Sequence, residues 1–434
     1  MKTRGFGAYA RRALPYLLII VVTLVLLDLV LIASGLYPPT YSYGHPDLGW
    51  VSARSASRMA SYQCMEKSLQ QSHTVQLNED GHRSSRSIIG LRGPGKVFEI
   101  AVSGDSHTDL CADNSETHFG FMESELNERG VSAVTFAYGA GRYSPLQAYL
   151  AIEEGIRANQ ADAFVLNLYV GNDFFDMMRV DDRPYLTPGE DGYKITEPVW
   201  YSYDSPDSVK HSRVLYVLNQ AAKGVGIKSL TVRLRFLYDT AREQGMGVGA
   251  VAGYMNAIRR SMSSDLGYPA AFSAQILNQQ LFFEYFPGSR DESLRRVAAL
   301  MSAIRERHPD LMLIMSPIPS YQAAYTQPVD PAFLSVLDQL SLNHEEGMRK
   351  EEVLHERLRA EARGAGWLFV DNMAALQAYD GHARLYNDFD YHITPAAGEV
   401  IGRGQAAVIA AAIRRARDSA TDTTVSTTDV AADW

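Results

Sequence analysis

Two residues that can carry nucleophilic catalysis stand far apart in the chain. Ser106 lies in Gly104-Asp105-Ser106, directly after a short apolar run, and His392 lies near the carboxyl terminus. An imidazole can take a proton from a serine hydroxyl and return it to a leaving group when a carboxylate fixes its tautomer. Taken alone, Gly-Asp-Ser also fits a plain turn, and a lone histidine is usually structural. The pair is a hypothesis that depends on the rest of the sequence.

A second group of residues could stabilise the negative charge that develops in acyl transfer. The apolar run 166–170 ends in Gly171-Asn172-Asp173, and another apolar run ends at Gly139. An asparagine side chain and a backbone N–H at a glycine can both donate to an oxyanion. A turn in which Asn and Asp cap the next segment explains the first motif equally well.

These motifs stand at the ends of predicted strands. Apolar runs predict strands at about 97–102, 131–138, 163–170, 311–316 and 367–370, and amphipathic patterns predict helices at 115–129, 145–159 and 395–417. Strands and helices that alternate in this way form a parallel sheet with helices on both faces. Loops at the carboxyl ends of such strands converge on one edge, where ligands bind. We therefore expect Ser106, Gly139 and Asn172 to meet there.

In chain order, these motifs and Asp390-Tyr391-His392 resemble the blocks of the SGNH (GDSL-type) hydrolase superfamily. The resemblance covers about residues 96–412, apart from a central insertion. It implies an α/β fold with a flavodoxin-like, doubly wound parallel sheet. The segment 78–83, Asn-Glu-Asp-Gly-His-Arg, also looks like membrane-anchored members that are linked to envelope polysaccharides.

The resemblance implies a role for each motif. Ser106 is the expected nucleophile and His392 the general acid–base. The expected oxyanion hole consists of the backbone N–H groups of Ser106 and Gly139 and the side chain of Asn172. The remaining residues of the motifs are expected to support these groups: Gly104, Asp105, Gly171 and Asp173.

The orienting acid departs from the commonest pattern of the family, in which an aspartate stands three residues before the histidine. That position is Phe389 in this sequence. Because a D-x-H spacing also occurs among related members, we select Asp390, with Asp388 as the alternate.

The amino terminus carries a membrane signal. Four basic residues lie in 1–13, and an apolar run at 14–36 has about the ~20 residues that a helix needs to cross a bilayer. The basic flank predicts a cytoplasmic tip, a single-pass anchor in the inner (cytoplasmic) membrane and a periplasmic domain. Small residues at 33–35 leave a cleaved signal peptide as the alternative, although the run exceeds the usual ~7–15 apolar residues.

The rest of the chain divides into three parts. We expect an extracytoplasmic linker at 37–95, the hydrolase-like domain at 96–418 with an insertion at about 174–309, and a disordered tail at 419–434. A long charged helix is expected at 336–363. Aromatic residues in the insertion could stack on sugar rings, but large rings more often form core. They are Trp200, Tyr201, Tyr203, Phe236, Phe282, Phe283, Tyr285 and Phe286.

Composition argues against several other classes of function. The net charge of -9 and the lack of a basic stripe argue against nucleic acid. Gly139-Ala140-Gly141 mimics a dinucleotide motif, but Ser144 replaces its third glycine. Cys64 and Cys111 are the only cysteines and form no C-x-x-C pair, so we expect no metal and no cofactor. They could form a disulfide or remain two buried thiols.

We therefore expect a serine esterase (deacylase) that cleaves an O-acyl ester of an envelope carbohydrate through a Ser-His-Asp acyl-enzyme. An O-acyltransferase to a polysaccharide uses the same triad and would need a membrane acyl-transfer partner. A third alternative is a catalytically weak envelope assembly or binding protein, which Phe389 favours.

Overall fold

The computed structural model describes the chain in segments. These are residues 42–45, 47–52, 61–66, 71–78, 81–84, 97–180, 183–189, 192–197, 227–261, 279–324, 331–387 and 391–428, with scattered positions between 15 and 30. The predicted membrane helix at 14–36 lies mostly outside these segments. Its described positions are helical, and their large apolar side chains are exposed: Tyr16, Ile19, Val22, Leu26 and Val30. Insertion of this segment in a membrane stays a prediction.

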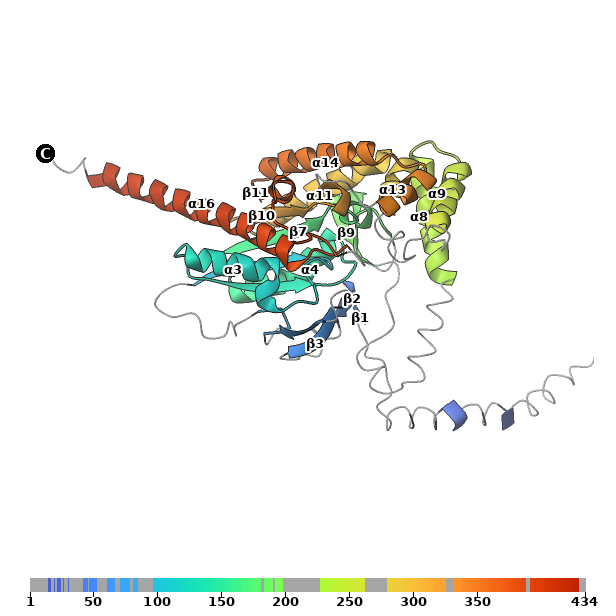
Figure 1. Ribbon diagram of the computed structural model, residues 1–434, viewed down its shortest axis with the longest axis horizontal. Helices are drawn as coiled ribbons and strands as arrows, with labels where there is room; N and C mark the ends of the chain where they lie inside the picture. The colour runs from blue at the N-terminus through green and yellow to red at the C-terminus, as the bar shows by residue number, and fades with distance from the viewer. Residues whose placement is uncertain are drawn as a thin grey trace, which may run out of the picture.

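A parallel sheet forms the centre of the described domain (Figure 1). In chain order its strands are β5 (Phe98–Gly104), β6 (Ala133–Gly139), β7 (Ala163–Tyr169), β10 (Met312–Ile318) and β11 (Leu368–Phe369). Across the sheet they follow the order β11-β10-β7-β5-β6. The first strand thus lies between the second and the third, which is the flavodoxin-like order. The predicted α/β class with a parallel sheet is confirmed.

Helices cover both faces of this sheet. α3 (His118–Glu128) and α16 (Pro395–Thr428) share one core with Ile100 and Val102, whereas α4 (Pro145–Asn159) and α11 (Gly288–Arg307) share the other with Ala101. Successive β5 residues therefore face opposite layers, as the pleat requires. Ser144, which stands where a dinucleotide motif would have glycine, is the N-cap of α4 and forms a capping box with Gln147.

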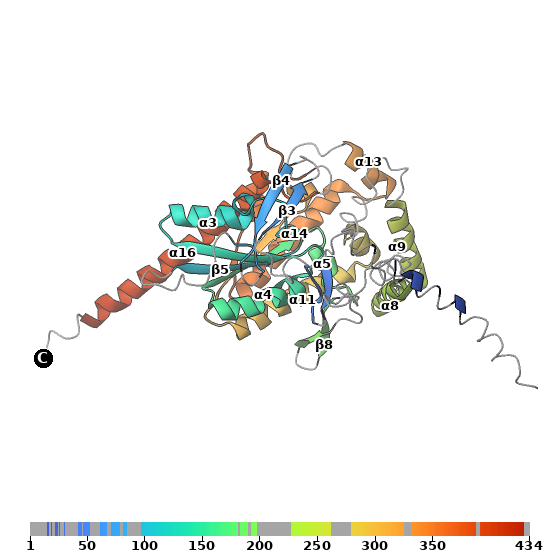
Figure 2. The ribbon, with the colours of Figure 1, turned by 90° about the horizontal axis from the view of Figure 1, so that it is seen from below.

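The insertion begins where β7 ends and returns to the sheet through α11, directly before β10. It comprises α5 (Asp173–Asp176), the hairpin β8 (Tyr185–Gly189) and β9 (Gly192–Thr196), α8 (Ile227–Glu243), α9 (Val248–Ser261) and α11. α8 and α9 stand at the end of the molecule opposite to the free end of α16 (Figures 1 and 2). Phe282 is fully buried and lies 4.7 Å from Phe175 and 5.1 Å from Phe286 between ring centroids.

The core interpretation is therefore right for the buried rings Phe282, Phe283 and Phe286. Phe236 and Tyr285 are partly buried against the same core. Trp200, Tyr201 and Tyr203 lie outside the described residues.

The helix expected at 336–363 is two helices, α13 (Pro331–Gln339) and α14 (His344–Gly364). Ser341 has a left-handed φ of 57°, which ends the first helix. The Asn343 side chain then accepts from Glu346 N at 2.8 Å and caps the second. Two shorter helices, α12 (Tyr321–Ala324) and α15 (Asn372–Gln377), follow β10 and β11.

The segment expected to be a linker folds in part onto the domain. It forms one hairpin of β1 (Ser42–His45) and β2 (Gly49–Ser52) and another of β3 (Ser61–Glu66) and β4 (Gln71–Gln76). Arg83 extends the sheet edge, because its N–H and carbonyl pair with Ala137 at 2.7 and 2.8 Å. The composition of this segment did not reveal these short strands. Each strand pairs with the neighbouring strand of its own hairpin.

α16 is the one described helix that is long and apolar enough to cross a membrane, over Pro395–Asp418. Its residues Ala406, Ile409 and Ala410 pack against Phe119 and Met122 of α3, as in a core helix. The helix continues to Thr428, which differs from the disordered tail expected after residue 418.

Candidate active site

Ser106 stands on the turn that follows β5. The N–H groups of Thr108 and Asp109 donate to the Asp105 carbonyl oxygen at 3.1 and 3.2 Å, so the chain turns as the strand ends. Asp105 is buried, and its Oδ1 accepts from His107 N at 2.9 Å. Ser106 is half-buried, with Oγ 3.4 Å from Asp105 Oδ2. The turn therefore fixes its own backbone and leaves the serine hydroxyl partly open.

Gly139 packs against this turn. β5 and β6 pair with Gly104 opposite Gly139. A Cβ at Gly139 would lie 2.8 Å from the Asp105 carbonyl oxygen and 2.9 Å from Asp109 N. Only glycine lets the end of β6 approach the nucleophile turn this closely. A Cβ on Gly141 would lie 4.0 Å from Ser106 Cβ, so the segment after β6 borders the serine.

Asn172 lies at the carboxyl end of the neighbouring strand β7 and is the N-cap residue of α5. Its Nδ2 donates to Asp176 Oδ2 at 3.1 Å, and its buried Oδ1 has no hydrogen-bond partner among the described residues. An amide nitrogen has two N–H groups, so the bond to Asp176 leaves a second one for a ligand. Asp173 Oδ2 accepts from Tyr169 N at 2.8 Å and fixes the turn that carries Asn172.

Asp176 is itself held by two guanidinium groups. It is buried, pairs with the fully buried Arg183, and lies 3.2 Å from Arg179 Nη1. A buried carboxylate needs such partners because water cannot solvate it. Asn172 therefore donates to an anchored acceptor.

His392 lies against the residue that follows Ser106. The ring centroids of His107 and His392 are 5.0 Å apart, and His107 stacks on Tyr169 at 3.9 Å. His392 is half-buried, whereas His107 and Tyr169 are buried. The structure thus brings His392 to the turn that carries Ser106.

The backbone before His392 is constrained. Tyr391 has φ 54°, a left-handed conformation that is strained for an aromatic residue. Its N–H donates to the Asn387 carbonyl oxygen at 3.0 Å, and its buried ring meets Tyr321 at 4.2 Å. Asn387 N donates to the His392 carbonyl oxygen at 2.9 Å and closes the loop. Packing and hydrogen bonds therefore constrain the backbone at Tyr391, next to His392.

Asp390 and Asp388, the two candidates for the orienting acid, lie outside the described residues, as does Phe389. The third member of the triad stays a prediction.

Burial dominates the electrostatics of this edge. It raises the pKa of Asp105 to about 6, against the lowering effects of His107 N and His392. It also raises the pKa of Asp173, to which the charges of Asp105 and Asp176 add. The pKa of His107 is well below its usual range because of burial and the nearby His392. His107 is therefore neutral at pH 7.

A cavity of about 40 Å³, lined by both polar and apolar groups, adjoins Gly171. Its lining includes Gln280 and Gln322, whose Oε1 atoms are buried and have no hydrogen-bond partner in the described part of the chain. Glu351 also lines it, accepts from Ser320 N at 2.7 Å, and has a pKa raised by burial to about 7. The cavity therefore contains these acceptors, and the basic side chains of Arg290 and Lys350 also line it.

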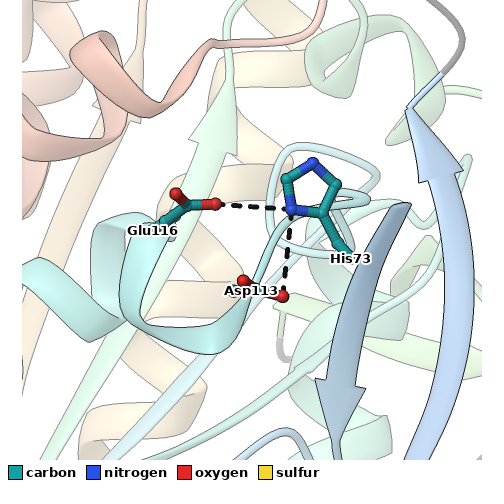
Figure 3. A group of neighbouring side chains, drawn as sticks. All are labelled: His73, Asp113 and Glu116. Carbon is teal, nitrogen blue, oxygen red and sulfur yellow. Dashed lines mark ion pairs between the residues drawn. The ribbon is translucent and has the colours of Figure 1, made fainter. Parts of the chain in front are cut away.

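One group of described residues could hold a metal ion, and it shares no residue with this edge. His73, Asp113 and Glu116 offer one imidazole nitrogen and two carboxylates, within 4.8 Å of one another (Figure 3). Near it, Cys111 is disulfide-bonded, and Cys64 is the only other cysteine of the chain. Of the two alternatives for the cysteines, the disulfide is the one that forms.

The sequence did not reveal the residues that contact and position Asn172 and His392. Asp176 and Arg183 follow Asn172 closely in sequence, but no pattern shows which acid an arginine will pair with. His107 is adjacent to Ser106, and its contact with His392 depends on residues far apart in the chain.

Comparisons with known proteins give a distant likeness. No family model matches the sequence, and no curated protein matches it. Among solved structures, the chain is similar to LAE5, an alpha/beta hydrolase enzyme from the metagenome of Lake Arreo, with 11% identity and TM-score 0.34 over 73% of this chain and 97% of that one. It is also similar to a catalytic mutant of Axe2, an acetylxylan esterase from Geobacillus stearothermophilus, with 12% identity and TM-score 0.33 over 73% and 95%. Function must therefore be argued from the side chains.

Proposed function

We propose that the protein is a serine esterase that removes an O-acyl group through an acyl-enzyme on Ser106. One observation carries the proposal. Ser106 and Asn172 follow β5 and β7, adjacent parallel strands between which the connections of the sheet reverse direction. Ligands of doubly wound sheets bind at that point.

In this proposal, His392 takes the proton of the Ser106 hydroxyl as Oγ attacks the ester carbonyl carbon. The second N–H of Asn172 and the backbone N–H groups of Ser106 and Gly139 donate to the oxyanion. The tetrahedral intermediate collapses, the C–O bond of the ester breaks, and His392 returns the proton to the leaving alcohol. Water then attacks the acyl-enzyme by the same route in reverse, with Asp390, or alternatively Asp388, orienting the imidazole.

A hydroxyl group of the substrate would suit the cavity beside Gly171, which has room for such a group and not for a whole sugar ring. The unpartnered Oε1 atoms of Gln280 and Gln322 need donors, and hydroxyl groups supply them. This supports a carbohydrate as the alcohol part of the ester.

An extracytoplasmic location is part of the proposal. The exposed apolar positions between Tyr16 and Val30 support an anchor in the cytoplasmic membrane. The disulfide at Cys111 supports an oxidising compartment, since cytosolic proteins rarely keep such bonds.

Release of p-nitrophenol from p-nitrophenyl acetate tests the esterase proposal. We expect turnover by the full-length protein in detergent, its loss in Ser106→Ala, and no change in the matched control Ser302→Ala, an exposed serine of α11. Wild-type turnover that survives in Ser106→Ala would reject the proposed nucleophile. Adding an oligosaccharide acceptor then separates the two chemistries, because a transferase yields an acylated sugar and an esterase yields free acetate.

A further inference from the structure

His73, Asp113 and Glu116 form a cluster that the proposed ester chemistry does not use. His73 lies in β4, and the two acids lie at the start and end of the turn around η1 (Asn114–Glu116). His73 Nδ1 is 3.8 Å from Asp113 Oδ1 and 3.4 Å from Glu116 Oε2. Figure 3 shows both carboxylates pointing toward this nitrogen.

One polar atom of this cluster has no hydrogen-bond partner among the described residues. His73 is only 9% exposed. Glu116 Oε2 is buried and forms no hydrogen bond, although Nδ1 is 3.4 Å away. The Glu116 side chain is 44% exposed as a whole, so only the oxygen that faces His73 is covered, and a cation beside it would supply the partner that it lacks. Ligand atoms that surround one metal ion lie close together in this way, without the geometry of a hydrogen bond between them.

Two contacts fix the Asp113 carboxylate and the backbone of the η1 turn without help from an ion. Thr74 N donates to Asp113 Oδ1 at 2.8 Å, and Asn114 Nδ2 donates to the Gln76 carbonyl oxygen at 3.0 Å. Both bonds join β4 to the η1 turn, and the disulfide at Cys111 lies just before this turn. The site is therefore preorganised, which lowers the entropic cost of binding.

We propose that His73 Nδ1, one Asp113 oxygen and Glu116 Oε2 bind a single Zn²⁺ ion. Zn²⁺ accepts imidazole nitrogen and carboxylate oxygen at about 2.0–2.2 Å, which places neighbouring ligand atoms about 3.3–3.6 Å apart. The two separations at His73 are 3.4 and 3.8 Å, and all three ligand atoms lie within 4.8 Å of one another, so the carboxylates must close on a common centre to reach this range. Ca²⁺ and Mg²⁺ prefer all-oxygen sites, so the imidazole favours zinc. The ion fastens the β3–β4 hairpin to the segment between Ser106 and α3.

Metal content tests this directly. Untagged full-length protein in detergent is stripped with EDTA, equilibrated with Zn²⁺, and freed of unbound metal, and bound zinc is then counted by mass spectrometry. We expect one Zn²⁺ per chain in the wild type and its loss in His73→Ala and in the isosteric Glu116→Gln. The matched controls His382→Ala and Glu128→Gln, at exposed positions, should keep it. Zn²⁺ should also raise the melting temperature of the wild type by at least about 2 °C, and Mg²⁺ at the same concentration should not.

Wild-type protein that retains no zinc would overturn the proposal. So would equal zinc in the wild type and the Glu116→Gln variant, which removes a charge but hardly changes shape. If His73→Ala fails to fold by circular dichroism, Glu116→Gln and Asp113→Asn decide the outcome. None of these readouts depends on ester hydrolysis.

Discussion

The side chain of Asn172 donates to the carboxylate of Asp176, 3.1 Å away and one helical turn further on. Asp176 in turn pairs with Arg183, which has no exposed surface. The acceptor can hold the amide in one orientation because the acceptor is itself anchored. This chain of contacts supports Asn172 as an oxyanion donor.

Replacing Asn172 by alanine should slow turnover without unfolding the protein. Losing one oxyanion donor typically costs about 3 kcal/mol of transition-state stabilisation, so kcat for p-nitrophenyl acetate should fall by about 10²–10³. Steady-state kinetics and a thermal melt measure the two effects. The control is Asn159→Ala, at the end of α4 and away from this edge. An Asn172→Ala enzyme with wild-type kcat would remove Asn172 from the mechanism.

Breaking the Asp176–Arg183 pair should destabilise the fold. Asp176→Ala removes a carboxylate that pairs with the buried guanidinium of Arg183, which should cost about 3–5 kcal/mol in the free energy of unfolding. The double variant Asp176→Leu, Arg183→Met should cost less than the sum of its two single changes, Asp176→Leu and Arg183→Met. Denaturant unfolding of the full cycle gives the coupling energy. Simple additivity of the two changes would mean that the pair is not energetically linked.

Asp105→Asn should stabilise the protein at neutral pH. Because the folded pKa of Asp105 is about 6 and the usual value is 3.8, the wild type loses stability as the pH rises between these values. Above pH 6, the ionised buried carboxylate costs about 2–3 kcal/mol that asparagine avoids. The gain should shrink toward zero near pH 4. A gain that is the same at pH 4 and pH 8 would contradict the raised pKa.

Gly139→Ala should disturb the nucleophile turn. The added Cβ would meet the Asp105 backbone 2.8 Å away, and overpacking of this kind costs about 1–3 kcal/mol. Since the turn carries Ser106, activity should fall more steeply than stability. Gly249→Ala is the matched control, because a Cβ there meets nothing within 4 Å and alanine favours the α9 helix. Equal effects of the two changes would show that Gly139 is not confined.

The sequence predicted those features that depend on local pattern. Apolar runs placed the strands to within a few residues, and the α4 helix had the limits 145–159 in both prediction and structure. The alternation of strand and helix predicted the parallel sheet, whereas the flavodoxin-like order was implied only by the family resemblance. That order brings Ser106 and Asn172 to one edge.

Features that depend on partners distant in sequence escaped prediction. The 37–95 segment was expected to be a linker because its composition is polar, yet Arg83 completes a bridge to Ala137 of β6. Ser341 in a left-handed conformation broke a helix that the charge pattern predicted as continuous. His73 lies about 40 residues before Asp113 and Glu116, so no local spacing in the sequence indicated that these three residues form a cluster.

Covalent labelling of Ser106 tests the central claim most directly. The full-length protein is treated with a fluorophosphonate probe, digested, and mapped by mass spectrometry, alongside His392→Ala and the exposed-histidine control His382→Ala. We predict a single modified serine, Ser106, in the wild type and in His382→Ala, with labelling at least about 10²-fold slower in His392→Ala because the general base is gone. A modified serine elsewhere, or labelling of Ser106 at the same rate without His392, would contradict the account.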